Sequence, residues 1–344
     1  MKKTAIITGA DGGMGTEITR AVAMAGYHVI MLCYTAFRGE ERRSQLILDT
    51  KNEDIEVMQV DLSSMDNIVE VAQRISAKET SVDLLMNNAG TMRTHFSQTE
   101  DGFEYTVAVN YLAPFLLTHR LLPLMHAGTR IVNMVSCTYA IGKIGPHFFT
   151  HGKEGSFWRI PIYSNTKLAL WLFTCRLARK LKDKGITVNA ADPGIVSTNI
   201  ISMDMWFDPL TDVLFRPFIR TPRQGADTAI RLLLEPDLEG VTGQMFARKV
   251  PEPSAGRKRM DRYGKTSATF HDYRKERTGP ERITPATDIP TSPRPIPDTN
   301  RWNEGFFRYL RHSDKSPEPS GPKYLIFGLF FIITRQVNFE PLEK

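Results

Sequence analysis

The chain of 344 residues is long enough for one large domain, or for a domain with an appendage, and its 41% hydrophobic residues suffice for a sizeable core. Its net charge of +6 is unevenly placed, because residues 1–249 carry 27 basic and 26 acidic side chains and residues 250–344 carry 17 and 12. A nearly neutral main body gives no electrostatic reason to expect a nucleic-acid partner.

Short apolar runs alternate with amphipathic segments through the first 249 residues. The apolar runs read as buried strands and are 4–8, 28–33, 55–60, 83–86, 130–135, 187–191 and 244–247. Helical spacing is found over 14–25, 40–50, 64–78, 102–125, 163–184 and 223–234. This order predicts an α/β domain of the Rossmann type, with a doubly wound, mainly parallel sheet of about seven strands and helices on both faces.

A glycine-rich turn joins the first predicted strand to the first helix. It runs Thr-Gly-Ala-Asp-Gly-Gly-Met-Gly over residues 8–15. Glycines let the backbone turn tightly and approach a pyrophosphate, and the helix N-terminus then presents free N–H groups to it. Such turns often serve only as connections, but the position between a first strand and a helix favours a dinucleotide site.

The end of the second strand bears on the choice of cofactor. It reads Cys33-Tyr34 and has no carboxylate to bind the ribose hydroxyls of NAD. Arg38 follows a few residues later and is either an ordinary surface arginine or a partner for a 2′-phosphate. We therefore favour NADP(H) over NAD(H), although Asp11 counts against it if its side chain faces that phosphate.

Tyr163 and Lys167 are four residues apart and project from one face of a predicted helix. A phenol has a pKa of about 10, and a nearby ammonium lowers it. The pair is therefore suited to acid–base work in a carbonyl–alcohol interconversion. Tyr139 and Lys143 have the same spacing, but Gly142 interrupts that segment, whereas Tyr163 opens a long helix.

The order of the motifs resembles that of the short-chain dehydrogenase/reductase family over residues 1–249. The matching positions are loop 8–15, Asp61-Leu62, Asn87-Asn88-Ala89-Gly90, Asn110, Ser136, Tyr163, Lys167 and segment 193–198. Segments 130–136, 163–174 and 238–243 are similar to the retinol-dehydrogenase-like branch. That branch usually has an N-terminal membrane anchor that this sequence does not show, so retinoid chemistry is not implied.

The resemblance implies NAD(P)-dependent hydride transfer to or from a carbonyl or alcohol carbon. Tyr163 would exchange the proton, Lys167 would lower the tyrosine pKa and hold the nicotinamide ribose, and Ser136 would bind the substrate oxygen. Asn110 would hold a water that connects Lys167 to solvent. Alone, Ser136 reads as a strand-end serine and Asn110 as a helix polar residue bonded to backbone.

No metal is expected. The expected cofactor contacts are Gly9, Asp11, Gly13, Met14, Gly15, Tyr34, Arg38, Asp61, Leu62, Asn88, Ala89, Gly90, Tyr163, Lys167, Pro193, Gly194, Val196 and Thr198.

Residues 195–220 are rich in apolar side chains, among them Trp206 and Phe207. A loop after the sixth strand is a natural lid, and its composition predicts a lipophilic small-molecule substrate. The alternative is that these side chains pack on the body or on a second subunit of a homo-oligomer. Residues 139–162 are read as an insertion near the mouth of the active site.

Residues 250–344 differ from the rest, with 12 of the 21 prolines. We expect a largely irregular tail whose partner is unknown, or a sequence that arose by a change of reading frame. Its apolar run 324–334 is shorter than the ~20 residues that cross a bilayer, so we expect no transmembrane segment.

Two other functions stay open: a dinucleotide-sensing protein without turnover, and a protein whose tail mediates interactions. The presence of both Tyr163 and Lys167 favours an enzyme. Three scattered cysteines fit no disulfide or metal pattern, which agrees with a reducing, cytoplasmic setting.

Overall fold

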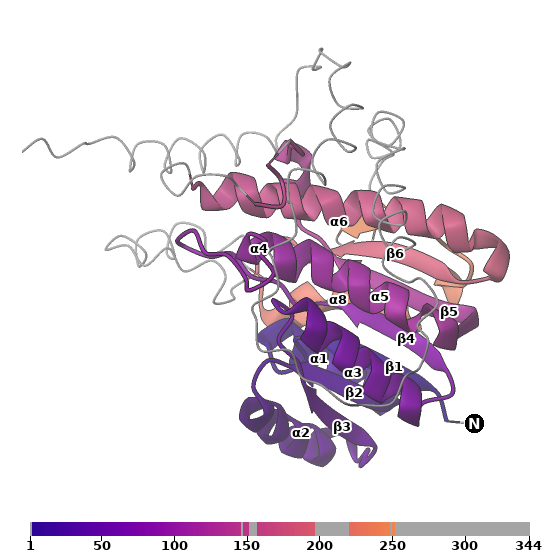
Figure 1. Ribbon diagram of the computed structural model, residues 1–344. Coiled ribbons are helices and arrows are strands. Elements are labelled where there is room, and N and C mark those ends of the chain that lie inside the picture. Colours follow the sequence, from indigo (N-terminus) through magenta and orange to yellow (C-terminus); the bar gives the residue numbers. More distant parts are fainter. Residues whose placement is uncertain (1, 146, 151–156, 197–219, 248–249, 252–344) are drawn as a thin grey trace, which may run out of the picture.

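An eight-stranded sheet with helices on both faces forms the centre of the molecule (Figure 1). The computed structural model describes residues 2–145, 147–150, 157–196, 220–247 and 250–251. The strands are β1 (Thr4–Thr8), β2 (His28–Cys33), β3 (Ile55–Gln59), β4 (Val82–Asn87), β5 (Met125–Met134), β6 (Thr187–Asp192), β7 (Met245–Ala247) and β8 (Val250–Pro251).

The strand order is β3-β2-β1-β4-β5-β6-β7-β8. Neighbours from β3 to β7 pair in parallel, which confirms the predicted doubly wound, mainly parallel sheet of about seven strands, and β8 pairs antiparallel with β7. The chain reverses direction across the sheet between β1 and β4, and the carboxyl ends of the strands at such a point form a binding crevice. The predicted glycine loop follows β1 and therefore lies at that crevice.

The helices form two layers (Figure 1). One layer holds α1 (Gly13–Met24), α2 (Ala36–Thr50) and α8 (Pro222–Leu234). The other holds α3 (Met65–Lys78), α4 (Tyr105–Val107), the π-helix η1 (Ala108–Leu112), α5 (Ala113–Leu121) and α6 (Arg159–Leu181). Short 3₁₀ turns are η2 (Leu122–Leu124), η3 (Cys137–Ile141), η5 (Lys182–Lys184) and η7 (Pro236–Leu238).

Alternate residues of each strand point to opposite faces of the sheet and pack against different helix layers. Ile6 packs with α3, α5 and α6, whereas Ile7 packs with α1, α2 and α8. Both side chains are at most 1% exposed. Both faces of the sheet are covered, which is why the strands read as continuous apolar runs.

Helix α2 begins at Ala36, four residues before its predicted start, and two further predicted helices also differ from the structure. The single helix predicted over 102–125 is α4, η1, α5 and η2 in succession, and Met125 already begins β5. Glu104 caps α4 by accepting a hydrogen bond from the Val107 backbone, and the π-turn follows at once. The other helix, α6, begins at Arg159, so Tyr163 lies in its second turn rather than at its start.

Val250–Pro251 lie just beyond the predicted domain boundary at residue 249 and pair with β7. This two-residue strand was not predicted, because it is too short to show a pattern. The remaining residues of the predicted tail lie outside the described part of the chain, so the division into 1–249 and 250–344 stays a prediction.

A chain of buried polar side chains joins three elements in the core. The Asn87 amide in β4 donates to Asn133 in β5 at 2.8 Å, and the Asn133 amide donates to the Thr174 hydroxyl in α6 at 2.8 Å. Asn133 and Thr174 are completely buried. Hydrogen bonds are directional, so this chain fixes how α6 sits on the sheet.

We predict that Asn133→Leu lowers the free energy of unfolding by roughly 1–3 kcal/mol. The volume changes little, but Asn87 loses an acceptor and Thr174 loses a donor in a dry environment. Urea denaturation measures the change. Asn67→Leu, at an exposed asparagine, is the matched control, and equal stability of parent and Asn133→Leu would contradict the role of the chain.

Candidate active site

The turn after β1 is shaped by two glycines. Gly9 has a φ of +60°, and a side chain at Gly15 would place its Cβ 2.0 Å from the Gly9 carbonyl oxygen. No larger residue fits at position 15 without moving backbone. Gly12 caps α1 without a side-chain hydrogen bond, so the first-turn N–H groups of this helix are available to an anion. The loop therefore fits the pyrophosphate of a dinucleotide.

The segment after β4 holds this loop in place. The Thr8 hydroxyl accepts hydrogen bonds from the backbone N–H groups of Asn88 and Ala89, both at 3.0 Å. The Asn88 amide donates to the carbonyls of Thr8 and Gly9 at 3.0 and 3.1 Å. Asn88 and Ala89, expected as cofactor contacts, thus first serve to set the shape of the glycine turn.

The segment after β6 closes the other side of the loop. Gly194 takes a φ of +74°, and Arg220 Nη1 donates to the Pro193 carbonyl at 2.8 Å. A Cβ at Gly225 of α8 would lie 2.6 Å from Val196, and one at Gly13 would lie 3.2 Å from Pro222. These close contacts bring the predicted nicotinamide segment beside Gly13, about 180 residues earlier in the chain. Thr198 and the predicted lid lie outside the described residues.

A carboxylate stands at the end of β2, contrary to the expectation from the order of residues. The Asp11 carboxylate comes from the glycine loop, contacts Cys33 and lies 3.6 Å from Arg38 Nε. Burial, followed by the charge of Asp11, raises the pKa of the Cys33 thiol to about 12. The expected cation, Arg38, and the opposing anion, Asp11, therefore face each other at the end of β2, where the adenosine of a dinucleotide is expected.

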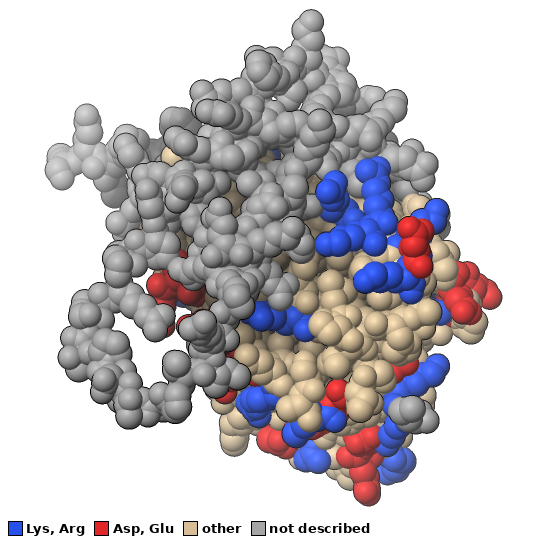
Figure 2. Space-filling model, turned by 45° about the vertical axis from the view of Figure 1, so that its right-hand side comes forward, with Lys and Arg blue, Asp and Glu red and all other residues tan. Residues whose placement is uncertain are grey.

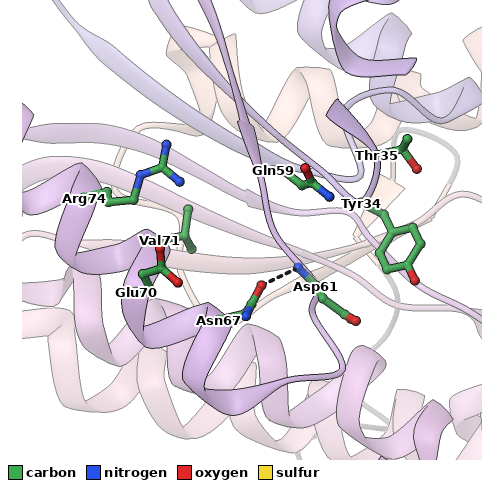
Figure 3. A pocket seen from close by; sticks show the side chains of 8 residues that line it. All are labelled: Tyr34, Thr35, Gln59, Asp61, Asn67, Glu70, Val71 and Arg74. Carbon is green, nitrogen blue, oxygen red and sulfur yellow. Dashed lines mark hydrogen bonds between the residues drawn. The ribbon is translucent and has the colours of Figure 1, made fainter. Parts of the chain in front are cut away.

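A polar pocket of about 420 Å³ lies beside this strand end (Figure 3). Its lining residues come from α3 on one side and from the ends of β2 and β3 on the other: Tyr34, Thr35, Gln59, Asp61, Asn67, Glu70, Val71 and Arg74. Tyr34 and Asp61, both expected to contact cofactor, share this pocket. Leu62, also expected, is partly buried and packs against the hydrophobic core, and its contact with a cofactor stays a prediction.

Tyr163 and Lys167 meet where β5 ends. Lys167 Nζ donates to the Met134 carbonyl at 2.9 Å and lies 5.4 Å from the centre of the Tyr163 ring. Lys167 is 2% exposed, whereas Tyr163 keeps part of its surface open. Ser136, the N-cap of η3, lies close enough to the Tyr163 hydroxyl to lower its pKa. Three of the four expected catalytic residues are therefore neighbours.

Burial controls the pKa values of the pair. It lowers the pKa of Lys167 to about 8, against a smaller opposite effect of Asp192. It raises the pKa of Tyr163 above its usual value, assisted by Cys137 and Asp192, while Ser136 lowers it. The balance at Tyr163 is thus opposite to the lowering that we expected from Lys167.

Asn110, the fourth expected residue, lies in the π-turn. Its amide bonds to both backbone groups of Thr91 at 2.8 Å and donates to Thr166 at 3.1 Å. A Cβ at Gly90 would lie 3.4 Å from Lys167 Nζ and 3.5 Å from Asn110 Oδ1, so Gly90 keeps the space between them open. A water link between Asn110 and Lys167 stays a prediction.

Comparison with known proteins supports the predicted family. A family model described as short chain dehydrogenase matches residues 3–204. The chain belongs to the short-chain dehydrogenase family. It is 38% identical over 247 residues to retinol dehydrogenase 12 of Homo sapiens, covering 71% of this chain and 77% of that protein.

Retinol dehydrogenase 14 of Mus musculus is also 38% identical, over 259 residues and with the same coverage. A blue fluorescent protein from a metagenomic library, solved with NADPH, superposes with a TM-score of 0.57 at 26% identity, over 71% of this chain and 95% of that one. The predicted retinol-dehydrogenase-like branch is confirmed, and the chain is an oxidoreductase of the alcohol–carbonyl type.

Tyr139, from the second pair with the spacing of Tyr163 and Lys167 in this short-chain dehydrogenase, has a structural role. Tyr139 is 8% exposed in η3 and its ring lies 6.4 Å from that of Trp171, whereas Lys143 is exposed. The described part of the predicted insertion continues in Phe148 and Phe149, which pack on Tyr111 next to Asn110. The insertion therefore packs against η1, the π-turn that carries Asn110.

Sequence reasoning missed two residues of the site, Cys137 and Asp192. Both affect the pKa of Tyr163, from η3 and from the end of β6. The available signal was an acidic residue at the end of a buried run, directly before Pro193-Gly194. Among the described residues there is no group of His, Cys, Asp and Glu that could hold a metal ion, and no helix is long and apolar enough to cross a membrane.

The described surface carries charges of both signs. On the face drawn in Figure 2, basic side chains gather in small groups with acidic ones nearby. This mixture agrees with the nearly neutral charge of residues 1–249.

We predict that Lys167→Met changes how stability depends on pH. The folded pKa of about 8 is below the unfolded value of about 10.4. Between these values the unfolded chain binds more protons, so the free energy of unfolding of the parent rises with pH, by roughly 3 kcal/mol at most, and that of the variant lacks this rise. Denaturant unfolding from pH 7.5 to 10.5 measures the difference between the two proteins.

The exposed Lys143→Met is the control, whose difference from the parent should stay constant over the same range. A constant difference for Lys167→Met as well would contradict the buried ammonium.

Proposed function

We propose that the protein transfers a hydride between NADP(H) and the carbonyl or alcohol carbon of an apolar small molecule, with Tyr163 exchanging the proton. A bound nicotinamide supplies or accepts the hydride. The observation that carries the proposal is the contact of Ser136 with the Tyr163 hydroxyl, beside the buried Lys167, at the crevice that the glycine loop also faces.

In the direction of reduction, the Tyr163 hydroxyl gives its proton to the carbonyl oxygen of the substrate while the carbonyl carbon gains a hydride. Ser136 binds the same oxygen while negative charge develops there. Lys167 is fixed by the Met134 carbonyl and carries the positive charge next to the phenolate that Tyr163 becomes. In oxidation the same groups act in reverse.

The preference for NADP(H) rests on Arg38. Its guanidinium is 60% exposed at the strand end that borders the polar pocket, where it can turn toward a 2′-phosphate. Asp11 competes for it at 3.6 Å. A phosphate with two charges attracts the guanidinium more strongly than one carboxylate does, so the pair opens when NADP(H) binds.

The preference for an apolar substrate has two supports. The relatives named above are retinol dehydrogenases, enzymes named for a lipophilic alcohol. Within the described part of the chain, Trp158 at the start of α6 and Ile195 after β6 are 50% and 36% exposed. Exposed apolar side chains on segments that flank a catalytic pair suit a long apolar alcohol or aldehyde, including a retinoid.

Tyr163→Phe should reduce kcat/KM by about 10²–10⁴-fold with little change in cofactor affinity, because it removes only the hydroxyl group that carries the exchanged proton. NADPH consumption with a panel of apolar aldehydes and ketones measures turnover, and fluorescence titration measures binding. Tyr139→Phe, the same change at the structural pair, is the matched control and should keep full turnover.

Undiminished turnover of Tyr163→Phe would remove the assigned role. Tight NADPH binding by the parent without turnover of any substrate class would favour the alternative of a dinucleotide-sensing protein.

Cofactor preference is tested at the ion pair. Arg38→Ala should weaken NADPH binding by about tenfold and leave NADH binding unchanged, since loss of one charge-assisted hydrogen bond costs about 1.5 kcal/mol. Asp11→Asn should tighten NADPH binding, because it frees Arg38 and removes a repelling charge. Dissociation constants for both cofactors decide this, with Arg42→Ala on the exposed face of α2 as the control. Equal effects on NADPH and NADH would contradict the preference.

A further inference from the structure

Asp192 is a buried carboxylate that the reaction as described does not use. It ends β6 and is 3% exposed. Ala191, directly before it, pairs with Met134 of β5, and the Val135 N–H donates to the Ala191 carbonyl at 2.9 Å. The ends of β5 and β6 therefore lie side by side. Met134, which ends β5 shortly before Ser136, binds Lys167, and Asp192 ends β6.

Asp192 has a role in the local structure. Asp192 Oδ1 accepts a hydrogen bond from the Gly194 N–H at 2.9 Å and stabilises the turn after β6. An asparagine makes the same bond without a charge. The bond to the Gly194 N–H therefore does not by itself require a carboxylate at this position.

Among the described residues, the titratable and charged groups related to Asp192 come from two sides. Helix α6 contributes Tyr163 and Lys167, and the chain before α8 contributes Arg220, whose guanidinium binds the Pro193 carbonyl, while the Cys137 thiol of η3 acts on Tyr163. Of the two cations, Lys167 is the buried one, in the site itself. Asp192 interacts electrostatically with both members of the proton-transfer pair.

We propose that Asp192 is a positioning residue for the reaction: its buried negative charge keeps Lys167 as an ammonium and Tyr163 as a phenol, and thereby sets the pH range in which the pair transfers a proton. The charge acts in the same sense on both groups, because an anion favours the protonated form of each. It opposes burial at Lys167 and adds to burial at Tyr163. The catalytic meaning rests on the proposed function, whereas the charge coupling does not.

The negative charge of Asp192 should affect carbonyl reduction and alcohol oxidation in opposite ways. Carbonyl reduction needs the protonated phenol, so the negative charge lets reduction continue to higher pH. Alcohol oxidation needs the phenolate, so the same charge delays oxidation until higher pH. Removing the charge should shift the alkaline limit of reduction and the onset of oxidation to lower pH by the same amount. Both reflect the titration of one coupled pair, Tyr163 and Lys167.

Asp192→Asn tests the charge and retains the turn. The first readout needs neither substrate nor cofactor: ¹³C NMR titration of protein labelled at the lysine ε-carbons, with Lys167→Met identifying the signal. We expect the variant to lower the pKa of Lys167 from about 8 by roughly one unit. The second readout is the pH profile of kcat/KM, whose alkaline limit for reduction should fall by a similar amount.

Asp237→Asn, at an exposed aspartate of η7, is the matched control and should leave both readouts unchanged. If Asp192→Asn does not fold, Asp192→Ser keeps a neutral acceptor for the Gly194 N–H and gives the same comparison. An unchanged Lys167 titration in a folded neutral variant would overturn the proposal and leave Asp192 a purely structural turn residue.

Failure of the proposed function is distinguishable from this outcome. If Tyr163→Phe kept full turnover, the pH profile would lose its meaning, but the NMR titration would still decide whether Asp192 holds the proton on Lys167.

Discussion

The parallel pairing of β1 with β4 is the constraint on which the site depends. It places the turn after β1 against the segment after β4, where the Thr8 hydroxyl and the Asn88 amide lock the two together. Strands β5 and β6 continue the sheet on the same side, so Ser136 and Asp192 reach the same edge. Groups spread over more than 180 residues converge because parallel strands end together.

The fold could be predicted, and the residues of the candidate site could be named, because their signals are local. Buried strands read as apolar runs, the glycine turn follows a strand directly, and Tyr163 and Lys167 share one helix face. What could not be predicted depends on distance in space. Asp11 reaches the end of β2 from another loop, and Asp192 acts on the pKa of Lys167 from the end of β6. The members of each pair lie on different elements, so neither the period of a helix nor that of a strand relates them.

The effect of burial on pKa values was the other part that the sequence could not supply. Spacing shows that a lysine is near a tyrosine, but not that Lys167 is 2% exposed and bonded to a carbonyl. Desolvation then acts on each group separately, which explains why the pKa of Tyr163 rises although a lysine is nearby. Such a buried ammonium lowers stability, a cost commonly found where function requires charge in the interior.

The hydrogen bond between Asn133 and Thr174 has a consequence for the position of Tyr163. Thr174 lies seven residues after Lys167, about two turns along the same face of α6. A slip of α6 by one residue would rotate every side chain by about 100° and swing Tyr163 away from Ser136. It would also break the bond to Asn133, whose partner is fixed in the sheet. The bond to the buried Asn133 thus permits only one rotational setting of α6, the helix that carries Tyr163.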